Sequence, residues 1–144
     1  MQHEQLTEKI INAFYHVFNT LGYGFLEKVY ENSMIIELRK IGLQAEQQVP
    51  ISVYYDAQDV GDYFADIVVN NLVIIEIKAA DALVQENHNQ LINYLKATDK
   101  EVGLLLNFGK SAEIKRAIFS NEKKPVLLKQ LSLAKGEPLE QSKQ

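Results

Sequence analysis

The sequence contains no cysteine, which excludes a disulfide framework, thiolate catalysis and a zinc or iron–sulfur centre held by cysteine ligands. Long apolar runs are also missing, since no stretch approaches the roughly 18 residues that a membrane helix needs. The first residues lack the basic and then apolar pattern of a secretory signal. We therefore expect a soluble, cytoplasmic protein.

Internal repeats and low-complexity segments are absent as well. The chain has 144 residues, of which 47% are hydrophobic and 24% charged, and this size and composition fit one globular domain. We predict a single domain over residues 1–144, with a core at about 7–119 and a flexible polar tail at 134–144.

A net positive charge is missing too, which speaks against a general nucleic-acid binder. The formal net charge is −4, but residues 1–95 carry five Lys and Arg against thirteen Asp and Glu, whereas residues 96–144 carry ten against six. Such an uneven distribution lets one surface attract phosphate although the whole molecule is acidic. The charge balance is therefore compatible with a nucleic-acid partner.

The spacing of apolar residues predicts helices over residues 7–21 and 26–41, where apolar positions recur every three or four residues. Apolar runs predict strands at 44–55, 63–69, 72–80 and 102–108, with a helix at 83–97. Residues 113–119 fit either an edge strand or a short helix. This order predicts an α/β fold in which a mixed central sheet with one helical crossover is flanked by helices.

Three charged residues interrupt the two apolar strands of a predicted hairpin: Asp66 in the first strand, and Glu76 and Lys78 in the second. Side chains alternate between the faces of a strand, so Glu76 and Lys78 project from one face, about 7 Å apart. Asp66 joins that face only if the loop has an odd number of residues or the hairpin contains a bulge. We predict such a loop at Asn70 and Asn71, because asparagine tolerates left-handed turn conformations.

Buried ionised groups need partners or a metal to offset the cost of losing water. Carboxylate and carbonyl oxygens suit Mg²⁺ or Mn²⁺, so the predicted ligands are Asp66, Glu76 and the backbone carbonyl of Ile77. Lys78 could orient an attacking water or stabilise charge on a phosphate, and the implied reaction is phosphodiester hydrolysis. The alternative is a solvated Glu76–Lys78 ion pair on a sheet face, which predicts diverging side chains.

Two predicted helices carry polar side chains that could face this cluster. Glu27, Tyr30 and Glu31 lie three or four positions apart on the helix at 26–41, and Gln90 and Tyr94 lie four apart on the helix at 83–97. Each set could line a site. Surface positions, or a tyrosine whose hydroxyl is satisfied within the core, explain both sets as well.

The order of Asp66, then Glu76-Ile77-Lys78, then a helix with Gln90 and Tyr94 resembles the PD-(D/E)xK nuclease superfamily. The motif Gly24-x-x-Glu27-x-x-Tyr30 resembles the hallmark of its small GxxExxY branch. The resemblance covers residues from about 7 to 119. One departure is Ala65, which stands where the superfamily name has proline, at a position that supplies no ligand.

The resemblance implies a restriction-endonuclease-like core of αβββαβ type, in which Asp66 and Glu76 bind the metal and Lys78 is the catalytic lysine. It also implies that Glu27 is a catalytic acidic residue near the metal, and that Gln90 and Tyr94 line the site. His88, two residues before Gln90, is a further candidate, although a capping or surface role explains it equally well.

The function expected from these features is that of a Mg²⁺-dependent nuclease acting on DNA. A homodimer is plausible, because one small site cuts one strand and a double-strand cut needs two. The alternative is a nuclease-fold protein that binds a nucleic acid or another protein without cutting. No separate DNA-recognition module fits in the remaining length.

Overall fold

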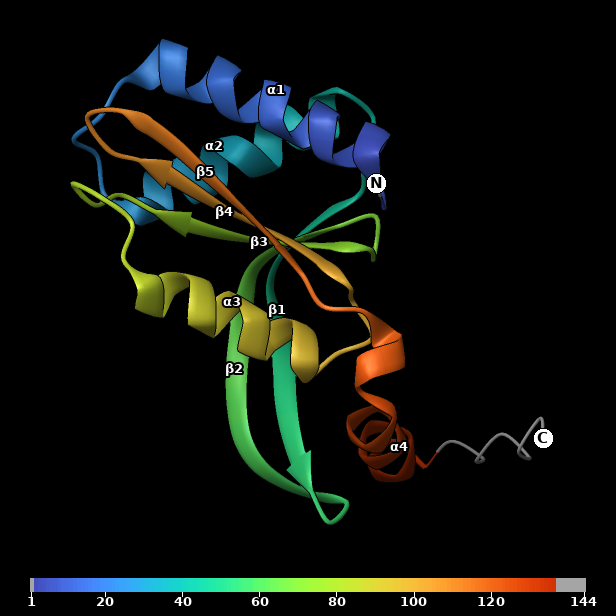
Figure 1. The fold of residues 1–144 in the computed structure, drawn as a ribbon. Coiled ribbons are helices and arrows are strands. Elements are labelled where there is room, and N and C mark those ends of the chain that lie inside the picture. The colour runs from blue at the N-terminus through green and yellow to red at the C-terminus, as the bar shows by residue number, and fades with distance from the viewer. Residues whose placement is uncertain (1, 137–144) are drawn as a thin grey trace.

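The computed structural model describes residues 2–136 (Figure 1). Its elements follow the chain in the order α1 (Glu4–Leu21), α2 (Glu27–Lys40), β1 (Ala45–Tyr55), β2 (Gln58–Val69), β3 (Val73–Lys78), α3 (Gln85–Lys96), β4 (Val102–Phe108), β5 (Ala112–Ile118), the short 3-10 helix η1 (Asn121–Lys123) and α4 (Pro125–Ala134). The predicted order of two helices, three strands, a helix and a strand is confirmed. Residues 113–119 lie mostly in a strand, β5.

The strands form one sheet in the order β1-β2-β3-β4-β5. Neighbouring strands are antiparallel except β3 and β4, which are parallel and are joined by α3. A parallel pair needs such a crossover, because the chain has to return from the end of one strand to the end of the sheet where that strand began before the next strand can run in the same direction. The predicted mixed sheet with flanking helices is therefore confirmed.

Helices cover both faces of the sheet (Figure 1). On one face, α1 and α2 pack through a core that includes Phe14, Met34 and Phe108. On the other face, α3 packs through Leu91 and Leu95. The approach of α3 is close, because a Cβ atom at Gly103 of β4 would lie only 2.7 Å from Cδ1 of Leu91. Among the described residues, no helix is long and apolar enough to cross a membrane.

Strands β1 and β2 extend beyond the rest of the sheet as a two-stranded arm (Figure 1). The predicted second strand began at residue 63, whereas β2 begins at Gln58. The difference arises because pairing with β1 continues to Tyr55 and Gln58, around a turn in which Asp56 and Ala57 both have positive φ. This distal part has few buried residues, so its sequence lacks the apolar pattern that marks the other strands.

Helix α4 was not predicted, and it lies beside the arm, where the side chain of Gln130 accepts a hydrogen bond from the backbone of Ala57. Its first residue is Pro125, a residue suited to the start of a helix. The predicted flexible tail at 134–144 falls outside the described residues from 137 onward.

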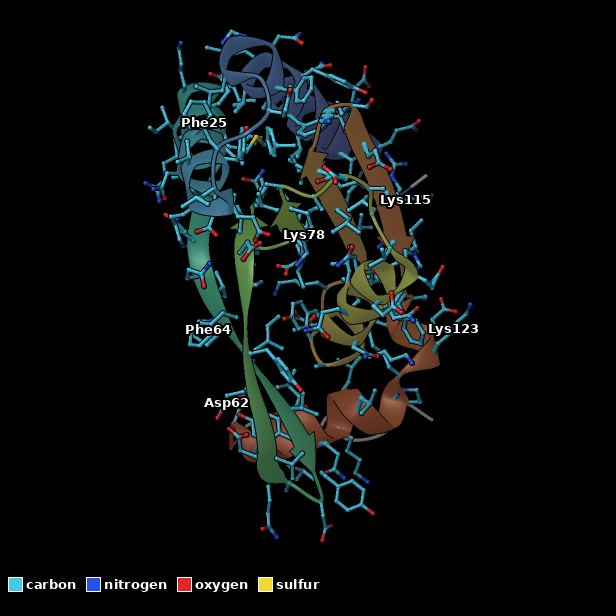
Figure 2. All side chains as sticks on the ribbon, turned by 90° about the vertical axis from the view of Figure 1, so that its left-hand side faces the viewer. Phe25, Asp62, Phe64, Lys78, Lys115 and Lys123 are labelled. Atoms are coloured by element: carbon cyan, nitrogen blue, oxygen red, sulfur yellow. The ribbon has the colours of Figure 1, made fainter. Side chains whose placement is uncertain are left out.

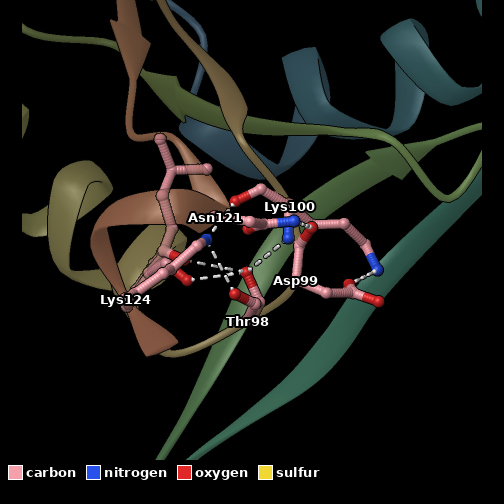
Figure 3. A network of polar contacts seen from close by, with 7 residues as sticks. Thr98, Asp99, Lys100, Asn121 and Lys124 are labelled. Carbon is pink, nitrogen blue, oxygen red and sulfur yellow. Dashed lines mark hydrogen bonds and ion pairs between the residues drawn. The ribbon is translucent and has the colours of Figure 1, made fainter. Parts of the chain in front are cut away.

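A buried lysine joins α4 to the body of the protein (Figure 3). Lys124 is 2% exposed, and its Nζ donates hydrogen bonds to the carbonyl oxygens of Leu95 (2.6 Å), Thr98 (2.8 Å) and Lys100 (2.7 Å). These carbonyls lie at and beyond the C-terminal end of α3, where a positive charge is favourable. Burial lowers the pKa of Lys124 to about 8, against the charges of Glu101 and Asp99, which raise it.

Candidate active site

The loop between β2 and β3 brings the predicted carboxylates to one face. It consists of three residues, Asn70 to Leu72, because Val69 pairs with Val73. Asn70 and Asn71 have φ angles of 51° and 56°, the left-handed conformation that asparagine tolerates better than most residues. The predicted odd-length loop is therefore confirmed. Its register places Asp66 of β2 opposite Glu76 of β3, one position beyond Ile67 and Ile75, the last pair of the antiparallel ladder.

The two carboxylates exchange hydrogen bonds with each other's strands. The backbone N–H of Asp66 donates to Oε2 of Glu76 at 2.8 Å, and the N–H of Ile77 donates to Oδ2 of Asp66 at 2.8 Å. Side-chain oxygens thus take the place of backbone carbonyls where β2 and β3 part. The carboxylates are held at fixed positions, because each is bonded to the main chain of a rigid strand.

Burial and repulsion from neighbouring carboxylates, Glu31 for Asp66 and Asp66 for Glu76, make both groups harder to ionise. Glu76 is only 7% exposed, and burial, followed by the charge of Asp66, raises its pKa to about 8. Burial also raises the pKa of Asp66, with the hydrogen bond from Ile77 acting in the opposite direction. The charge of Lys78 lowers the pKa of both carboxyls, so the lysine lies close enough to stabilise their ionised forms.

Lys78 is the last residue of β3, and the chain beyond it is anchored by Asn107 of β4. Lys78 and Asn107 are paired in the parallel ladder. The fully buried Asn107 side chain accepts from the N–H of Ala80 at 2.9 Å and donates to the carbonyl of Ala80 at 3.0 Å and to Glu113 at 2.9 Å. These hydrogen bonds fix the end of β3. From there Lys78 projects toward the side of the sheet that α3 covers (Figure 2).

A third carboxylate, Glu31 of α2, approaches the pair through a glutamine. Nε2 of Gln48 lies 3.0 Å from Oε1 of Glu31 and 3.3 Å from Oδ1 of Asp66. Gln48 has a φ of 53° inside β1, a conformation that costs free energy for a residue other than glycine and that often marks a functional site. The buried Glu31 also accepts hydrogen bonds from Lys28 and Gln47.

Glu27, which was predicted as the acidic residue of this helix, is exposed in the first turn of α2. None of the hydrogen bonds that surround Asp66 involves it. Glu31 reaches the cluster instead, four positions further along the same helix. The helical spacing had placed Glu27 and Glu31 on one side, but it could not show which of them comes closer to the strands.

Gln90 and Tyr94 of α3, which the sequence predicts as site-lining residues, are hydrogen-bonded to each other. Nε2 of Gln90 donates to the hydroxyl of Tyr94 at 2.9 Å. Burial raises the pKa of Tyr94, and the charges of Glu76 and Asp66 raise it further, so this hydroxyl lies on the same side of the sheet as the carboxylates. The ring of Tyr94 also lies 5.7 Å from the ring of Tyr63 on the arm.

Two predicted site residues, Tyr30 and His88, lie apart from this cluster. Tyr30 belongs to the core on the opposite face of the sheet, fully buried and stacked on Phe108 with 4.3 Å between ring centroids. Its hydroxyl donates to the carbonyl of Gly22 at 2.6 Å and accepts from the N–H of Phe25 at 3.2 Å. The hydroxyl is therefore used to hold the α1–α2 loop.

His88 lines a different cavity, of about 300 Å³, between α3 and β5. Lys115 and Arg116 line the same cavity. The structure thus keeps His88 apart from the carboxylate pair, because it lies on a part of α3 that faces β5.

The donor set fits a hard divalent cation. Within residues 2–136, no group of three or more His, Asp or Glu side chains could hold a metal by itself. Mg²⁺ needs fewer, since it is usually bound by one or two carboxylates together with water and substrate phosphate. The N–H and C=O of one strand residue point toward the same neighbouring strand; since the N–H of Ile77 reaches Asp66, its carbonyl faces that side too.

A mixed α/β sheet that brings two acidic side chains and a lysine together where two adjacent strands part is consistent with a nuclease-type, restriction-endonuclease-like fold. A sequence model of the PD-(D/E)XK nuclease superfamily matches residues 4–117. The chain therefore belongs to the PD-(D/E)XK nuclease superfamily.

The solved structures to which the chain is similar include SSO0001 and an alkaline exonuclease. The crystal structure of SSO0001 matches with a TM-score of 0.53 and 17% identity, over 91% of this chain and 68% of the other. An alkaline exonuclease, LHK-Exo from Laribacter hongkongensis, matches with a TM-score of 0.36 and 10% identity, over 90% and 91%. The first similarity supports the fold alone. No curated protein matches the sequence.

Proposed function

We propose that this protein is a divalent-metal-dependent nuclease that hydrolyses phosphodiester bonds of DNA. The observation that carries the proposal is the reciprocal pair of the half-buried Asp66 and the buried Glu76, whose carboxylates each accept a hydrogen bond from the partner strand, with Lys78 beside them. Two like charges in a buried position are costly without a counter-ion. A bound cation would offset that cost, and a purely structural role gives no reason to build the pair.

Each residue then has a distinct task. Asp66, Glu76 and the carbonyl of Ile77 would hold Mg²⁺ or Mn²⁺, which when bound polarises the phosphate and lowers the pKa of a coordinated water. Lys78, as a compact ammonium group, neutralises charge that develops on the phosphate or orients the attacking water. One site of this kind cuts one strand, so cutting both strands of a duplex would take two copies of the chain.

We further propose that the chain belongs to the GxxExxY branch of the superfamily, on the basis of Gly24, Glu27 and Tyr30. Two of these three residues have a structural reason in this fold. Gly24 has a φ of 111°, which side chains rarely tolerate, and Tyr30 holds the loop that contains it. Glu27 has no such reason, and its exposed position leaves it free to meet a substrate or a second cation.

The experiment is a cleavage assay on linear, circular and single-stranded DNA with Mg²⁺, Mn²⁺ or EDTA. We expect Lys78→Ala to lower cleavage by at least about 100-fold, a typical loss for one group that stabilises transition-state charge, while Mn²⁺ binding measured by calorimetry is kept. Asp66→Asn should weaken both cleavage and Mn²⁺ binding. The matched control is Asp62→Asn, an acidic residue of the arm that points away from α3 (Figure 2).

Cleavage that survives in both Lys78→Ala and Asp66→Asn would identify a contaminating nuclease and refute the proposal. Equal Mn²⁺ affinity in the wild type and Asp66→Asn would refute the ligand assignment. If the wild type cuts no DNA and releases no heat with Mn²⁺, the second candidate function is favoured: a nuclease-fold protein that binds without cutting. The hydrogen bonds of Glu31 favour that second function, because Lys28 and Gln48 already supply this carboxylate with protein donors.

A further inference from the structure

A groove runs between the β1–β2 arm and α3, next to the carboxylate pair. Its volume is about 310 Å³, and it is lined by Tyr63 of the arm, by Asn93, Tyr94 and Lys96 of α3, and by Leu127 of α4. This volume lies at the small end of the range for ligand pockets. The groove is therefore large enough for one or two planar rings and too small for a double helix.

Two tyrosine rings that contact each other form part of the wall of this groove. Tyr63 is 44% exposed, and its ring centroid lies 5.7 Å from that of Tyr94, with the rings tilted by 48°. An exposed aromatic ring in a concave surface is poorly solvated and offers a flat face for stacking. Its neighbour Phe64 is 53% exposed but lies on the other side of the arm, pointing away from α3 (Figure 2).

Gln90 and Tyr94 of α3 link the groove to the candidate active site. Both side chains line the groove, and the charges of Glu76 and Asp66 act on the hydroxyl of Tyr94. A molecule in the groove would thus lie beside the carboxylates.

The charge of the groove is complementary to a phosphate backbone. Among its described lining residues, the single charged one is Lys96, whose Nζ lies 5.4 Å from the centre of the Phe119 ring. That cation–π contact holds the ammonium group against the Phe119 ring. Apolar walls with two aromatic rings, two side-chain amides and one cation are the combination with which proteins bind single-stranded nucleic acid.

We propose that this groove binds the bases of single-stranded DNA next to the phosphate that is cut, with Tyr63 as the stacking platform. The inference rests on the proposed function, since it names the form of DNA that the same site takes. A duplex keeps its bases stacked on one another and offers only their edges, whereas a single strand can turn a base face toward a tyrosine ring. A strand end, or a strand opened by a partner, would therefore be the substrate.

The test is fluorescence anisotropy in EDTA, which separates binding from cleavage, with labelled oligo-dT of 20 nucleotides, a duplex of the same length and oligo-U. Tyr63→Ala should weaken binding of oligo-dT by about 5- to 100-fold, as expected for the loss of one stacked base. Tyr63→Phe keeps the ring and should bind within about 2-fold of the wild type. The matched control is Phe64→Ala, which removes an equally exposed ring from the other side of the arm and should also stay within about 2-fold.

Salt dependence gives a second, independent readout. Lys96→Gln should reduce the slope of log affinity against log salt by about 0.7, the value for one phosphate contact on a single strand. Circular dichroism spectra of all variants should match the wild type, because Tyr63, Phe64 and Lys96 lie at the surface of the groove or arm.

Several outcomes would overturn the inference. One is that Tyr63→Ala and Phe64→Ala weaken the binding of oligo-dT equally. Another is that the duplex binds as tightly as oligo-dT. A third is that oligo-U binds more tightly than oligo-dT, which would assign the groove to RNA. Failure of the proposed function looks different: Tyr63-dependent binding of oligo-dT without hydrolysis in Mg²⁺ or Mn²⁺ would refute the nuclease and support the groove. Hydrolysis that needs Asp66 but is indifferent to Tyr63 would do the reverse.

Discussion

The hydroxyl of Tyr30 offers a sharp test of whether this residue is structural, and the substitution is Tyr30→Phe. The ring, stacked on Phe108 in the core, would stay in place. The change removes one hydrogen bond to the carbonyl of Gly22 and one from the N–H of Phe25. Each such bond contributes about 0.5–1.5 kcal/mol net, so the free energy of unfolding should fall by about 1–3 kcal/mol. The melting temperature should fall by about 3–10 °C.

The assay is urea unfolding followed by circular dichroism, with Tyr15→Phe of the exposed face of α1 as the matched control. Tyr15→Phe should change stability by no more than about 0.5 kcal/mol. DNA cleavage by Tyr30→Phe, measured well below its unfolding midpoint, should equal that of the wild type. Unchanged stability together with a tenfold loss of cleavage would return Tyr30 to the site and refute its assignment to the core.

Three further predictions follow from buried polar contacts. Lys124→Met should lower the free energy of unfolding by about 2–4 kcal/mol, because three carbonyls lose their donor, whereas the exposed Lys123→Met should have little effect; equal losses would contradict this. Burial lowers the pKa of Lys124 to about 8 from 10.5. At a pH between these two pKa values, Lys124 is protonated mainly in the unfolded chain. The free energy of unfolding of the wild type should therefore rise relative to that of Lys124→Met as pH increases through this range. Urea unfolding that shows the wild type losing stability relative to Lys124→Met would contradict this. Asn107→Ala should lower kcat without changing Mn²⁺ affinity, because it releases the strand end behind Lys78; loss of Mn²⁺ binding would show a wider disruption.

Local patterns predicted the pair of carboxylates, because a strand has only two faces and a loop of known parity decides between them. The apolar runs on either side of Asp66 and Glu76 marked buried strands, and Asn70 and Asn71 marked the turn. Once the loop has three residues, the two acids must face each other. The sequence therefore predicts this part of the structure, because the pairing of the two strands is determined by a few neighbouring residues.

The contributions of α2 and of the arm depend on packing between distant segments. Glu27 and Glu31 lie on one side of a helix, and only its docking against β1 selects Glu31 through Gln48. The left-handed backbone conformation of Gln48 in the middle of a strand is not predicted by any sequence pattern. Asn107 likewise reads as an ordinary interruption of an apolar run, although its side chain fixes the segment after Lys78.

The projecting arm gives this small protein a part that can vary independently of its centre. Its turn at Asp56 and Ala57 lies at the far end from Asp66 along the same strands. Lengthening or shortening the hairpin by a pair of residues on each strand would preserve the alternation that orients Tyr63, yet would change how many nucleotides the proposed binding groove covers. The length of bound strand would then change through insertions at the tip, without any change to the residues proposed to bind the cation.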